Sequence, residues 1–257
     1  MNEDPQDRRV AVVTGAARGI GATIAGRLAR AGFRVVVADI DEAQAAACAA
    51  TLASEGLAAH GLRLDVADEA SVAAAFAQLD AQWGRCDVVV NNAGIARTFP
   101  FLEFPLDSWK AHLDVNVTGV LLCAQQGARR MQQRGWGRIV NVASVAGMRA
   151  VGVGRTGYGT SKAAVIGLTR QMAVELAAHG ITANAVAPGP VDTPMTRVLH
   201  TDRFREDYSS AIPLRRYGTQ EEVAATVAFL ASDEASYITG AVLPVDGGFL
   251  ASGAHRW

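Results

Sequence analysis

The chain has 257 residues, of which 50% are hydrophobic and 19% are charged, a composition typical of a globular protein with a substantial core. Its formal net charge is -1 and it has no basic run, so we do not expect a nucleic-acid partner. No apolar run approaches the roughly 18 residues of a membrane span, so we expect no membrane insertion.

The start of the chain is polar and acidic, which is unlike a signal peptide. We expect residues 1–9 to be a flexible tail and residues 10–257 to form one domain. Cys48, Cys86 and Cys123 are odd in number and widely spaced, which indicates reduced core residues in a cytoplasmic protein. The five histidines lack ligand spacing, so we expect no metal.

The first predicted strand, Val10–Val13, runs into a glycine-rich turn and then into a helical pattern from Gly19 to Ala31. The turn, Thr14–Gly21, reads TGxxxGxG. In the order strand, turn, helix, glycines let a backbone approach a pyrophosphate, and the helix N-terminus offers free N–H groups. A chance triplet is the alternative, because the chain holds 26 glycines.

The second predicted strand, Arg34–Ala38, ends at Asp39, which follows Gly21 by eighteen residues. An acid at about this spacing can bind a ribose hydroxyl. Asp39 could instead be the N-cap of the predicted helix over 42–54. The following elements are a strand at 58–64 ending at Asp65 and Val66, a helix at 69–83, and a strand at 87–90 that ends in Asn91–Gly94.

A long helix is predicted from Pro105 to Arg134, with Asn116 in its middle. Because Asn is a weak helix former, it needs a backbone partner or a role in a site there. A strand over 138–142 leads to Ser144, a glycine-rich loop, and a helix from Tyr158 to His179.

Tyr158 and Lys162 are four residues apart and therefore share one helix face. A nearby ammonium would lower the pKa of the phenol toward the range of general acid–base catalysis. Taken alone, the pair is more typical of an ordinary amphipathic helix start with a half-buried Tyr and a solvated Lys.

The sixth strand is predicted over 181–187 and stops at Pro188 and Gly189. Residues 191–218 are irregular and form either a substrate lid or a surface excursion. Thr219 and Glu222 have the spacing of a capping box that opens a helix to about residue 231, and a last strand spans 240–245. Strands that alternate with helices predict an α/β fold: a doubly wound parallel sheet of about seven strands with helices on both faces.

These motifs together resemble the classical short-chain dehydrogenase/reductase family. They are TGxxxGxG at Thr14–Gly21, NNAG at Asn91–Gly94, Asn116, Ser144, Tyr158 with Lys162, and Pro188–Gly189. The resemblance covers nearly the whole chain, and six motifs in register make coincidence very improbable.

The resemblance implies a catalytic set. Tyr158 would exchange the proton with the substrate oxygen, and Lys162 would lower the pKa of Tyr158 and hold the nicotinamide ribose. Ser144 would hydrogen-bond the substrate oxygen, and Asn116 would hold a water in a proton relay. The implied cofactor-binding residues are Gly15, Arg18, Gly19, Ile20, Gly21, Asp39, Asp65, Val66, Asn92, Ala93, Gly94, Tyr158, Lys162, Pro188, Gly189, Val191 and Thr193.

We expect an NAD-dependent oxidoreductase acting on a secondary alcohol or ketone, such as a polyol, sugar or small hydroxy compound. Asp39 would repel the 2′-phosphate of NADP, whereas Arg18 could attract it. The alternatives are an NADPH-dependent 3-oxoacyl-thioester reductase and a non-catalytic dinucleotide-sensing regulator. Arg149 and Arg155 could bind an acidic substrate, or lie at the surface.

The resemblance also implies a homotetramer. Small and apolar residues on two helices would suit the pairing, unless they face the core of the monomer. They are Leu121, Leu122, Ala163, Ala164, Val165 and Met172.

Overall fold

A seven-stranded sheet lies at the centre of the protein, in a computed structural model that describes residues 8–193, 196 and 201–252. The strand order is β3-β2-β1-β4-β5-β6-β7, and every neighbouring pair is parallel. The strands are β1 Val10–Thr14, β2 Arg34–Asp39, β3 Ala59–Arg63, β4 Val88–Asn91, β5 Gly137–Val142, β6 Ile181–Pro188 and β7 Val242–Val245. The predicted doubly wound α/β sheet is confirmed.

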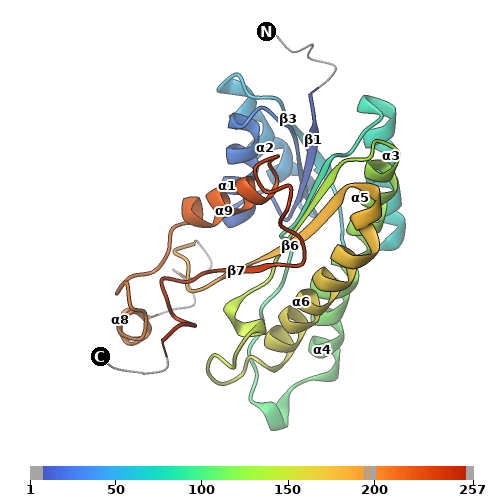
Figure 1. Cartoon of the computed structure of the whole chain (residues 1–257). Helices are drawn as coiled ribbons and strands as arrows, with labels where there is room; N and C mark the ends of the chain where they lie inside the picture. The colour runs from blue at the N-terminus through green and yellow to red at the C-terminus, as the bar shows by residue number, and fades with distance from the viewer. Residues whose placement is uncertain (1–7, 194–195, 197–200, 253–257) are drawn as a thin grey trace.

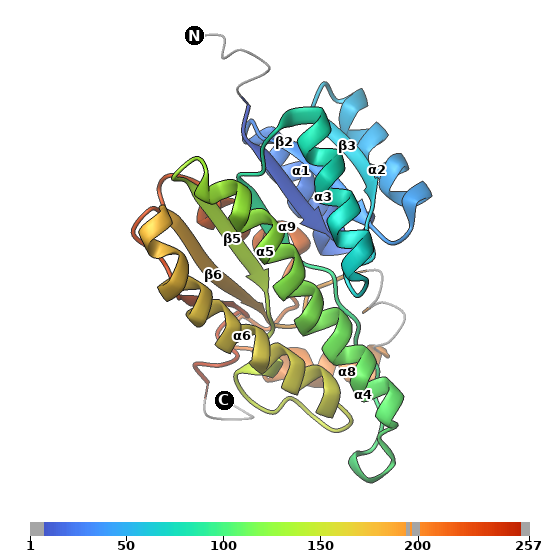
Figure 2. The ribbon, with the colours of Figure 1, turned by 90° about the vertical axis from the view of Figure 1, so that its right-hand side faces the viewer.

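Helices cover both faces of this sheet (Figure 1). The helices on one face are α3 Glu69–Trp83, α5 Gly119–Gln132 and α6 Thr156–Leu176, which stand in front of the sheet in Figure 2. Those on the other face are α1 Gly19–Arg30, α2 Glu42–Ser54 and α9 Gln220–Leu230. Alternate residues of one strand serve the two cores: Val10 and Val12 pack with α3, and Ala11 and Val13 pack with α1. This explains why the central strands β1 and β4 are mainly apolar.

The carboxyl ends of the strands gather the sequence motifs at one edge of the sheet. The strand order changes direction between β1 and β4, the place where parallel α/β sheets bind ligands. The glycine turn follows β1, NNAG continues from β4, and Ser144 follows β5. This edge is therefore where the candidate site is assembled.

The predicted long helix is divided by a π-helical turn. It comprises α4 Leu106–Leu113, a π turn at Asp114–Thr118 and α5. Asn116 lies within the π turn, where its side chain bonds to another segment rather than to its own helix. Such turns are frequent at functional sites.

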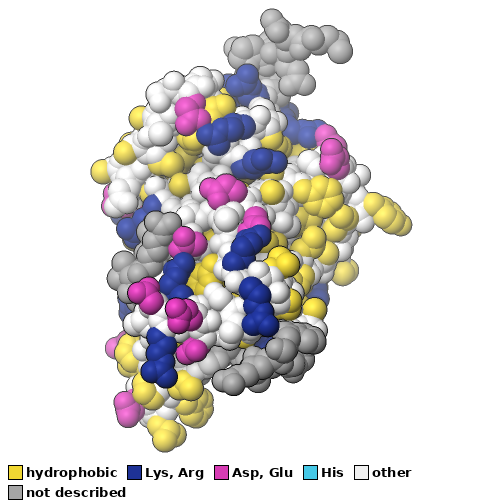
Figure 3. All heavy atoms as spheres, turned by 90° about the vertical axis from the view of Figure 1, so that its left-hand side faces the viewer, with side chains coloured by type: hydrophobic (Ala, Val, Ile, Leu, Met, Phe, Trp, Pro, Cys, Tyr) yellow, Lys and Arg dark blue, Asp and Glu magenta, His cyan; other side chains and the backbone are white. Residues whose placement is uncertain are grey.

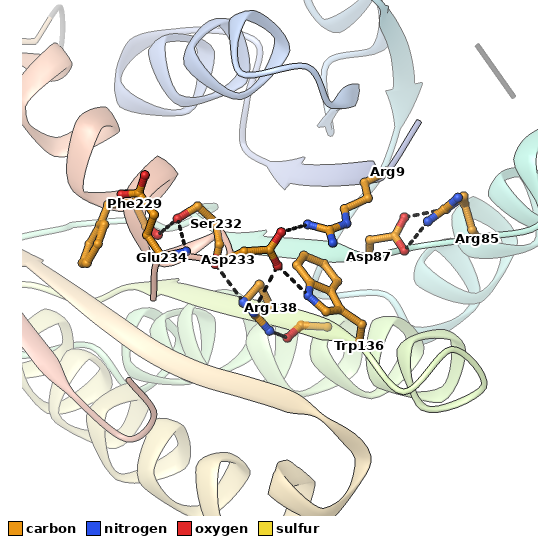
Figure 4. A network of polar contacts seen from close by, with 10 residues as sticks. Arg9, Arg85, Asp87, Trp136, Arg138, Phe229, Ser232, Asp233 and Glu234 are labelled. Carbon is orange, nitrogen blue, oxygen red and sulfur yellow. Dashed lines mark hydrogen bonds and ion pairs between the residues drawn. The ribbon is translucent and has the colours of Figure 1, made fainter. Parts of the chain in front are cut away.

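The amino-terminal edge of the sheet is held by a polar network, drawn in Figure 4. Arg9 pairs with Asp233 at 2.9 Å and its guanidinium lies 3.8 Å from the ring centroid of Trp136. Arg85 binds the buried carboxylate of Asp87 through two nitrogens. The expected tail over 1–9 is therefore wrong for Arg9, which belongs to the folded domain, and residues 1–7 lie outside the described residues.

The segment over 191–218 is an excursion from the sheet whose two ends lie next to each other. Val191 forms a parallel bridge with Gly218, and the helix α8 Asp202–Ser210 lies between them. The segment is thus more regular than predicted, although residues 194–195 and 197–200 are not described. After it, Thr219 and Glu222 form the predicted capping box of α9.

The surface on the α1 and α9 side carries interspersed acidic and basic side chains (Figure 3). Among the described residues, no helix is long and apolar enough to cross a membrane. Nor does any group of three His, Cys, Asp or Glu side chains in the described ranges have the arrangement of a metal site.

Candidate active site

Tyr158, Ser144 and Lys162 come together where β5 ends and α6 begins. Ser144 is buried just beyond β5, with its Oγ accepting a hydrogen bond from Ala146 N at 3.1 Å. Tyr158 is half-buried in the first turn of α6. One turn later, the buried Lys162 donates from Nζ to the carbonyl oxygen of Val142 at 2.6 Å. The Lys162 ammonium lies 5.8 Å from the centroid of the Tyr158 ring. The structure thus brings these three predicted residues into one site.

Burial governs the proton affinities of this pair. It raises the pKa of Tyr158, an effect opposed by a hydrogen bond with Ser144 and by the charge of Arg155. Burial also lowers the pKa of Lys162 from 10.5 to about 8. The expected lowering of the Tyr158 pKa by Lys162 is therefore wrong in this structure: the net direction is upward, and Ser144 and Arg155 supply the opposing effects.

Asn116 is fully buried and joins three segments. Its Oδ1 accepts from Ile95 N at 2.8 Å, and its Nδ2 donates to Ile95 O at 3.0 Å. The same Nδ2 also donates to Ser161 Oγ at 2.9 Å. Asn116 thereby fixes the chain after NNAG against the Tyr158 helix. Its role in a water relay stays a prediction.

The glycine turn and NNAG are locked together by hydrogen bonds and close contact. Thr14 Oγ1 accepts from the N–H groups of Asn92 and Ala93, each at 3.1 Å. Asn92 Nδ2 donates to Gly15 O at 3.0 Å. A Cβ at Gly21 would lie 2.3 Å from that same carbonyl, so only glycine fits without displacing the turn.

The N-terminus of α1 fits a pyrophosphate. Arg18, the exposed N-cap residue, makes no side-chain capping bond, and the first turn contains no acidic residue. Gly19 has nothing within 4 Å of its potential Cβ, while Ile20 packs against the core of the α1 face. The N–H groups and the positive end of the helix dipole are thus left for an anionic group.

Asp39 lies beside this turn at the end of β2. Its Oδ2 accepts from Ala17 N at 3.1 Å and its Oδ1 accepts from Asp41 N at 3.2 Å. Asp41, rather than Asp39, is the N-cap of α2, since its side chain accepts from Gln44 N. The alternative role of Asp39 as a helix cap is therefore wrong.

The remaining predicted residues border the same edge from both sides. Asp65 and Val66 follow β3, and Val66 is buried against Gly119 at the start of α5. Gly94 comes close to Asn116 and Lys162, since a Cβ there would lie 3.6 Å from Lys162 Nζ. On the other side, Pro188 ends β6, Gly189 N donates to Val245 O at 2.9 Å, Val191 is buried, and Thr193 bonds to Thr196.

Three contributors were missed by the sequence analysis. Thr14 clamps NNAG, Ser161 binds Asn116, and the fully buried His112 accepts from Arg97 N through Nε2 at 3.1 Å. Thr14 is the first residue of the TGxxxGxG motif, and its place in that motif is the signal that could have assigned it a role. No sequence signal singles out Ser161 or His112, because their roles depend on segments that only folding brings together.

Comparisons with known proteins identify the family of this chain. A family model described as "Enoyl-(Acyl carrier protein) reductase" matches residues 15–250. The chain therefore belongs to the classical short-chain dehydrogenase/reductase family, and it is an oxidoreductase of that family.

Two relatives are similar to this chain over nearly its whole length. It is 44% identical over 241 residues to a 3-oxoacyl-(acyl-carrier-protein) reductase of Aquifex aeolicus (strain VF5), covering 93% of this chain and 96% of the relative. It is 46% identical over 245 residues to a cis-4-hydroxycyclohexanecarboxylate dehydrogenase of Sinomonas cyclohexanicum, covering 95% and 97%.

Among solved structures, a gluconate 5-dehydrogenase from Burkholderia cenocepacia J2315 in complex with NADP and tartrate is similar, with a TM-score of 0.91 and 38% identity. The match covers 97% of this chain and 100% of that chain.

Proposed function

We propose that this protein interconverts a secondary alcohol and a ketone and prefers NAD(H) as its cofactor. The observation that carries the proposal is the convergence of Ser144, Tyr158 and Lys162 beside a glycine turn suited to a pyrophosphate. A regulator that only senses dinucleotides would have no need for an acid–base Tyr paired with a buried Lys. Its three free cysteines suit a reducing compartment, and we place it in the cytoplasm.

The side chains would divide the chemistry in a simple way. The nicotinamide cofactor, when bound, accepts or supplies the hydride. During alcohol oxidation, Tyr158 takes the hydroxyl proton, and in ketone reduction it returns that proton to the oxygen. Ser144 holds the reacting oxygen, and Lys162 orients the nicotinamide ribose. Asn116 keeps the wall formed by residues 94–97 in place, through both of its bonds to Ile95.

We propose that the remaining site residues contact the cofactor at successive positions from the adenine to the nicotinamide. Gly15, Arg18, Gly19, Ile20 and Gly21 would surround the pyrophosphate. Asp65 and Val66 would contact the adenine, and Asn92, Ala93 and Gly94 would pack along the dinucleotide. Pro188, Gly189, Val191 and Thr193 would border the nicotinamide, with the segment over 191–218 acting as a substrate lid.

Cofactor preference rests on Asp39. Its carboxylate is held at the end of β2 by Ala17 N and Asp41 N, and the next residue, Ile40, is 60% exposed and uncharged. A 2′-phosphate carries about -1.5 to -2 charges. Repulsion between two unit charges 4 Å apart is about 4 kcal/mol at an effective dielectric of 20. Screening reduces this value, but one third of it still gives about a tenfold preference.

A specific alternative comes from the 44% identical acyl-carrier-protein reductase. In that case the chain would reduce a 3-oxoacyl thioester with NADPH, and the exposed Arg18 would bind the 2′-phosphate. A panel of polyols, aldonates, cyclic hydroxy acids, cyclic ketones and 3-oxoacyl thioesters, followed at 340 nm with each cofactor, separates the two functions.

The decisive experiment compares kcat/KM for NAD and NADP in three proteins. We expect the unmodified enzyme to favour NAD by at least about tenfold. Asp39→Ala combined with Ile40→Arg should shift this ratio toward NADP, because a repulsive charge is replaced by an attractive one. Arg27→Ala removes an exposed arginine from the last turn of the same helix α1, so it serves as the matched control and should change NAD kinetics little. Better activity with NADPH in the unmodified enzyme would contradict the proposal and favour the thioester reductase.

A further inference from the structure

Two arginines lie between the catalytic Ser144 and Tyr158, and neither guanidinium has a carboxylate partner among the residues that the structure describes. Arg155 is the N-cap residue of α6, one turn before Tyr158. Arg149 lies with its guanidinium carbon 5.0 Å from the ring centroid of Phe249. Both arginines are half-buried, so their charges lie close to the segment that carries Ser144 and Tyr158 without a carboxylate among the described residues to balance them.

An aromatic layer places Arg149 close to the catalytic segment. Phe249 stacks on Tyr208 of α8, with ring centroids 5.4 Å apart. Both rings belong to an apolar cluster that includes Val145, the residue directly after Ser144. The helix α8, the turn at Phe249 and the catalytic segment therefore meet at one place.

The positive charges of Arg149 and Arg155 influence the pKa of the tyrosines at this meeting point. Burial raises the pKa of Tyr208, and Arg155 and Arg149 oppose that effect. Arg155 also acts on Tyr158 in the same direction. Two acids on the adjoining segments are engaged elsewhere: Asp246 accepts from Gly248 N and Leu250 N, and Asp192 pairs with Arg205 at 3.1 Å. The acids of α8 itself, Asp202, Glu206 and Asp207, are exposed at the surface.

We propose that Arg155 and Arg149, together with the Tyr208 hydroxyl, bind a carboxylate on the substrate. The enzyme would then act on secondary alcohols and ketones that also carry a carboxylate, with Tyr208 and Phe249 contacting the carbon skeleton between the two groups. A guanidinium matches a carboxylate in geometry and binds it through paired hydrogen bonds. This inference rests on the proposed function, because it names the substrate class of the same site.

Equilibrium binding tests the subsite without any catalytic step. Calorimetry with cyclohexanecarboxylate and cyclohexanecarboxamide compares a charged and a neutral ligand of nearly equal shape. We expect the carboxylate to bind about ten- to a hundredfold more tightly, as for hydrogen bonds to charged groups. Arg155→Met and Arg149→Met should each lose most of that difference.

Two further variants make the binding result specific. Arg203→Met removes an exposed arginine of α8, the helix that carries Tyr208, and should leave the difference unchanged. Arg155→Lys should keep part of it, because the charge remains while the fork geometry is lost. Equal binding of the two ligands, or no binding of either, overturns the carboxylate subsite.

Kinetics separates this inference from the proposed function. The ratio of kcat/KM for 4-oxocyclohexanecarboxylate and 4-oxocyclohexanecarboxamide should fall at least tenfold in Arg155→Met, mainly through KM. If the unmodified enzyme reduces both ketones equally well, the subsite is overturned and the oxidoreductase function stands. If it reduces neither ketone and no other compound of the panel, the proposed function fails. The carboxylate subsite is then still tested by the calorimetric comparison of the carboxylate with the carboxamide.

Discussion

Burial and neighbouring groups shift the pKa of Tyr158 in opposite directions. Burial favours the neutral phenol, and the Ser144 hydrogen bond and the Arg155 charge favour the phenolate. Oxidation of an alcohol requires the phenolate, whereas reduction of a ketone requires the phenol. The residues around Tyr158 therefore influence how the two directions depend on pH.

Replacing Tyr158 with Phe keeps the ring and removes the hydroxyl that we propose transfers the proton. We expect turnover to fall by roughly 10²–10⁴-fold, while the affinity for NAD, measured by fluorescence titration, changes little. Tyr237→Phe is the matched control, because the Tyr237 side chain is fully exposed. Turnover of Tyr158→Phe within a few-fold of the unmodified enzyme would show that another group transfers the proton.

Lys162 makes the stability of the protein depend on pH. Its pKa is about 8 in the folded protein and 10.5 ordinarily, because burial disfavours the ammonium. Between these values the unfolded chain holds a proton that the folded chain has released, so stability rises with pH in this window. The penalty for burying the charge is present in full below about pH 8 and is removed as the pH approaches 10.5.

Lys162→Met should therefore gain stability relative to the unmodified protein at pH 7 and lose this advantage by pH 10.5. The shift in pKa corresponds to at most about 3 kcal/mol, less about 1 kcal/mol for the bond to Val142 O that the variant lacks. Urea unfolding of both proteins at a series of pH values measures the difference. A difference that stays constant between pH 7.5 and 10.5 would contradict the prediction.

At the scale of elements, the glycine turn depends on the close approach of two loops. Gly21 begins α1 at a position where a Cβ would lie 2.3 Å from Gly15 O and 2.5 Å from Asn92 Nδ2. Both of these groups belong to the hydrogen-bonded clamp between the turn and NNAG. We therefore expect the clamp to couple cofactor binding to the packing of β1 against β4.

Gly21→Ala should disturb this clamp. We expect the free energy of unfolding to fall by about 1–3 kcal/mol, as for other overpacked sites, and NAD binding to weaken. Gly167→Ala is the control, since Gly167 lies on an exposed part of α6 with nothing within 4 Å of its potential Cβ. That variant should be stabilised by roughly 0.5–1 kcal/mol. Thermal unfolding with and without NAD measures both effects, and equal NAD affinity in both variants would count against the clamp.

At the scale of the whole molecule, α5 and α6 lie side by side on one outer face (Figure 2). Leu121, Ala163 and Ala164 are exposed there. Val165 and Met172, which we expected at a subunit interface, are instead buried in the core of the monomer. Leu122 is half-buried against the same core. The surface available for pairing is thus smaller than predicted, yet made of the small residues that allow close helix contact.

We predict a homotetramer in solution, assembled in part through this face. Ala164→Arg should lower the mass measured by light scattering, because it places a long charged side chain between paired helices. Ala50→Arg, an equivalent change on the exposed side of α2, should leave the mass unchanged. A monomeric mass for the unmodified protein would refute the prediction.

Local sequence patterns were sufficient for the seven strands, for most of the helices and for choosing the candidate site residues. Apolar runs marked the central strands, such as β1 and β4, because these strands are buried on both faces of the sheet. Thr219 and Glu222 marked the start of α9, because capping depends on residues three apart. Since strands of one parallel sheet end at the same edge, the sequence alone was enough to place residues that follow them, such as Ser144 and Asn92, at one edge of the sheet.

Only the tertiary structure decided matters that depend on contacts between distant segments. Burial reversed the expected direction of the Tyr158 pKa, and desolvation cannot be derived from the spacing of Tyr158 and Lys162. Folding also brought Ser161 to Asn116 and assigned Val165 to the core rather than to an interface. The sequence by itself determined which residues follow each strand, whereas packing decided what each side chain touches and how strongly it holds its proton.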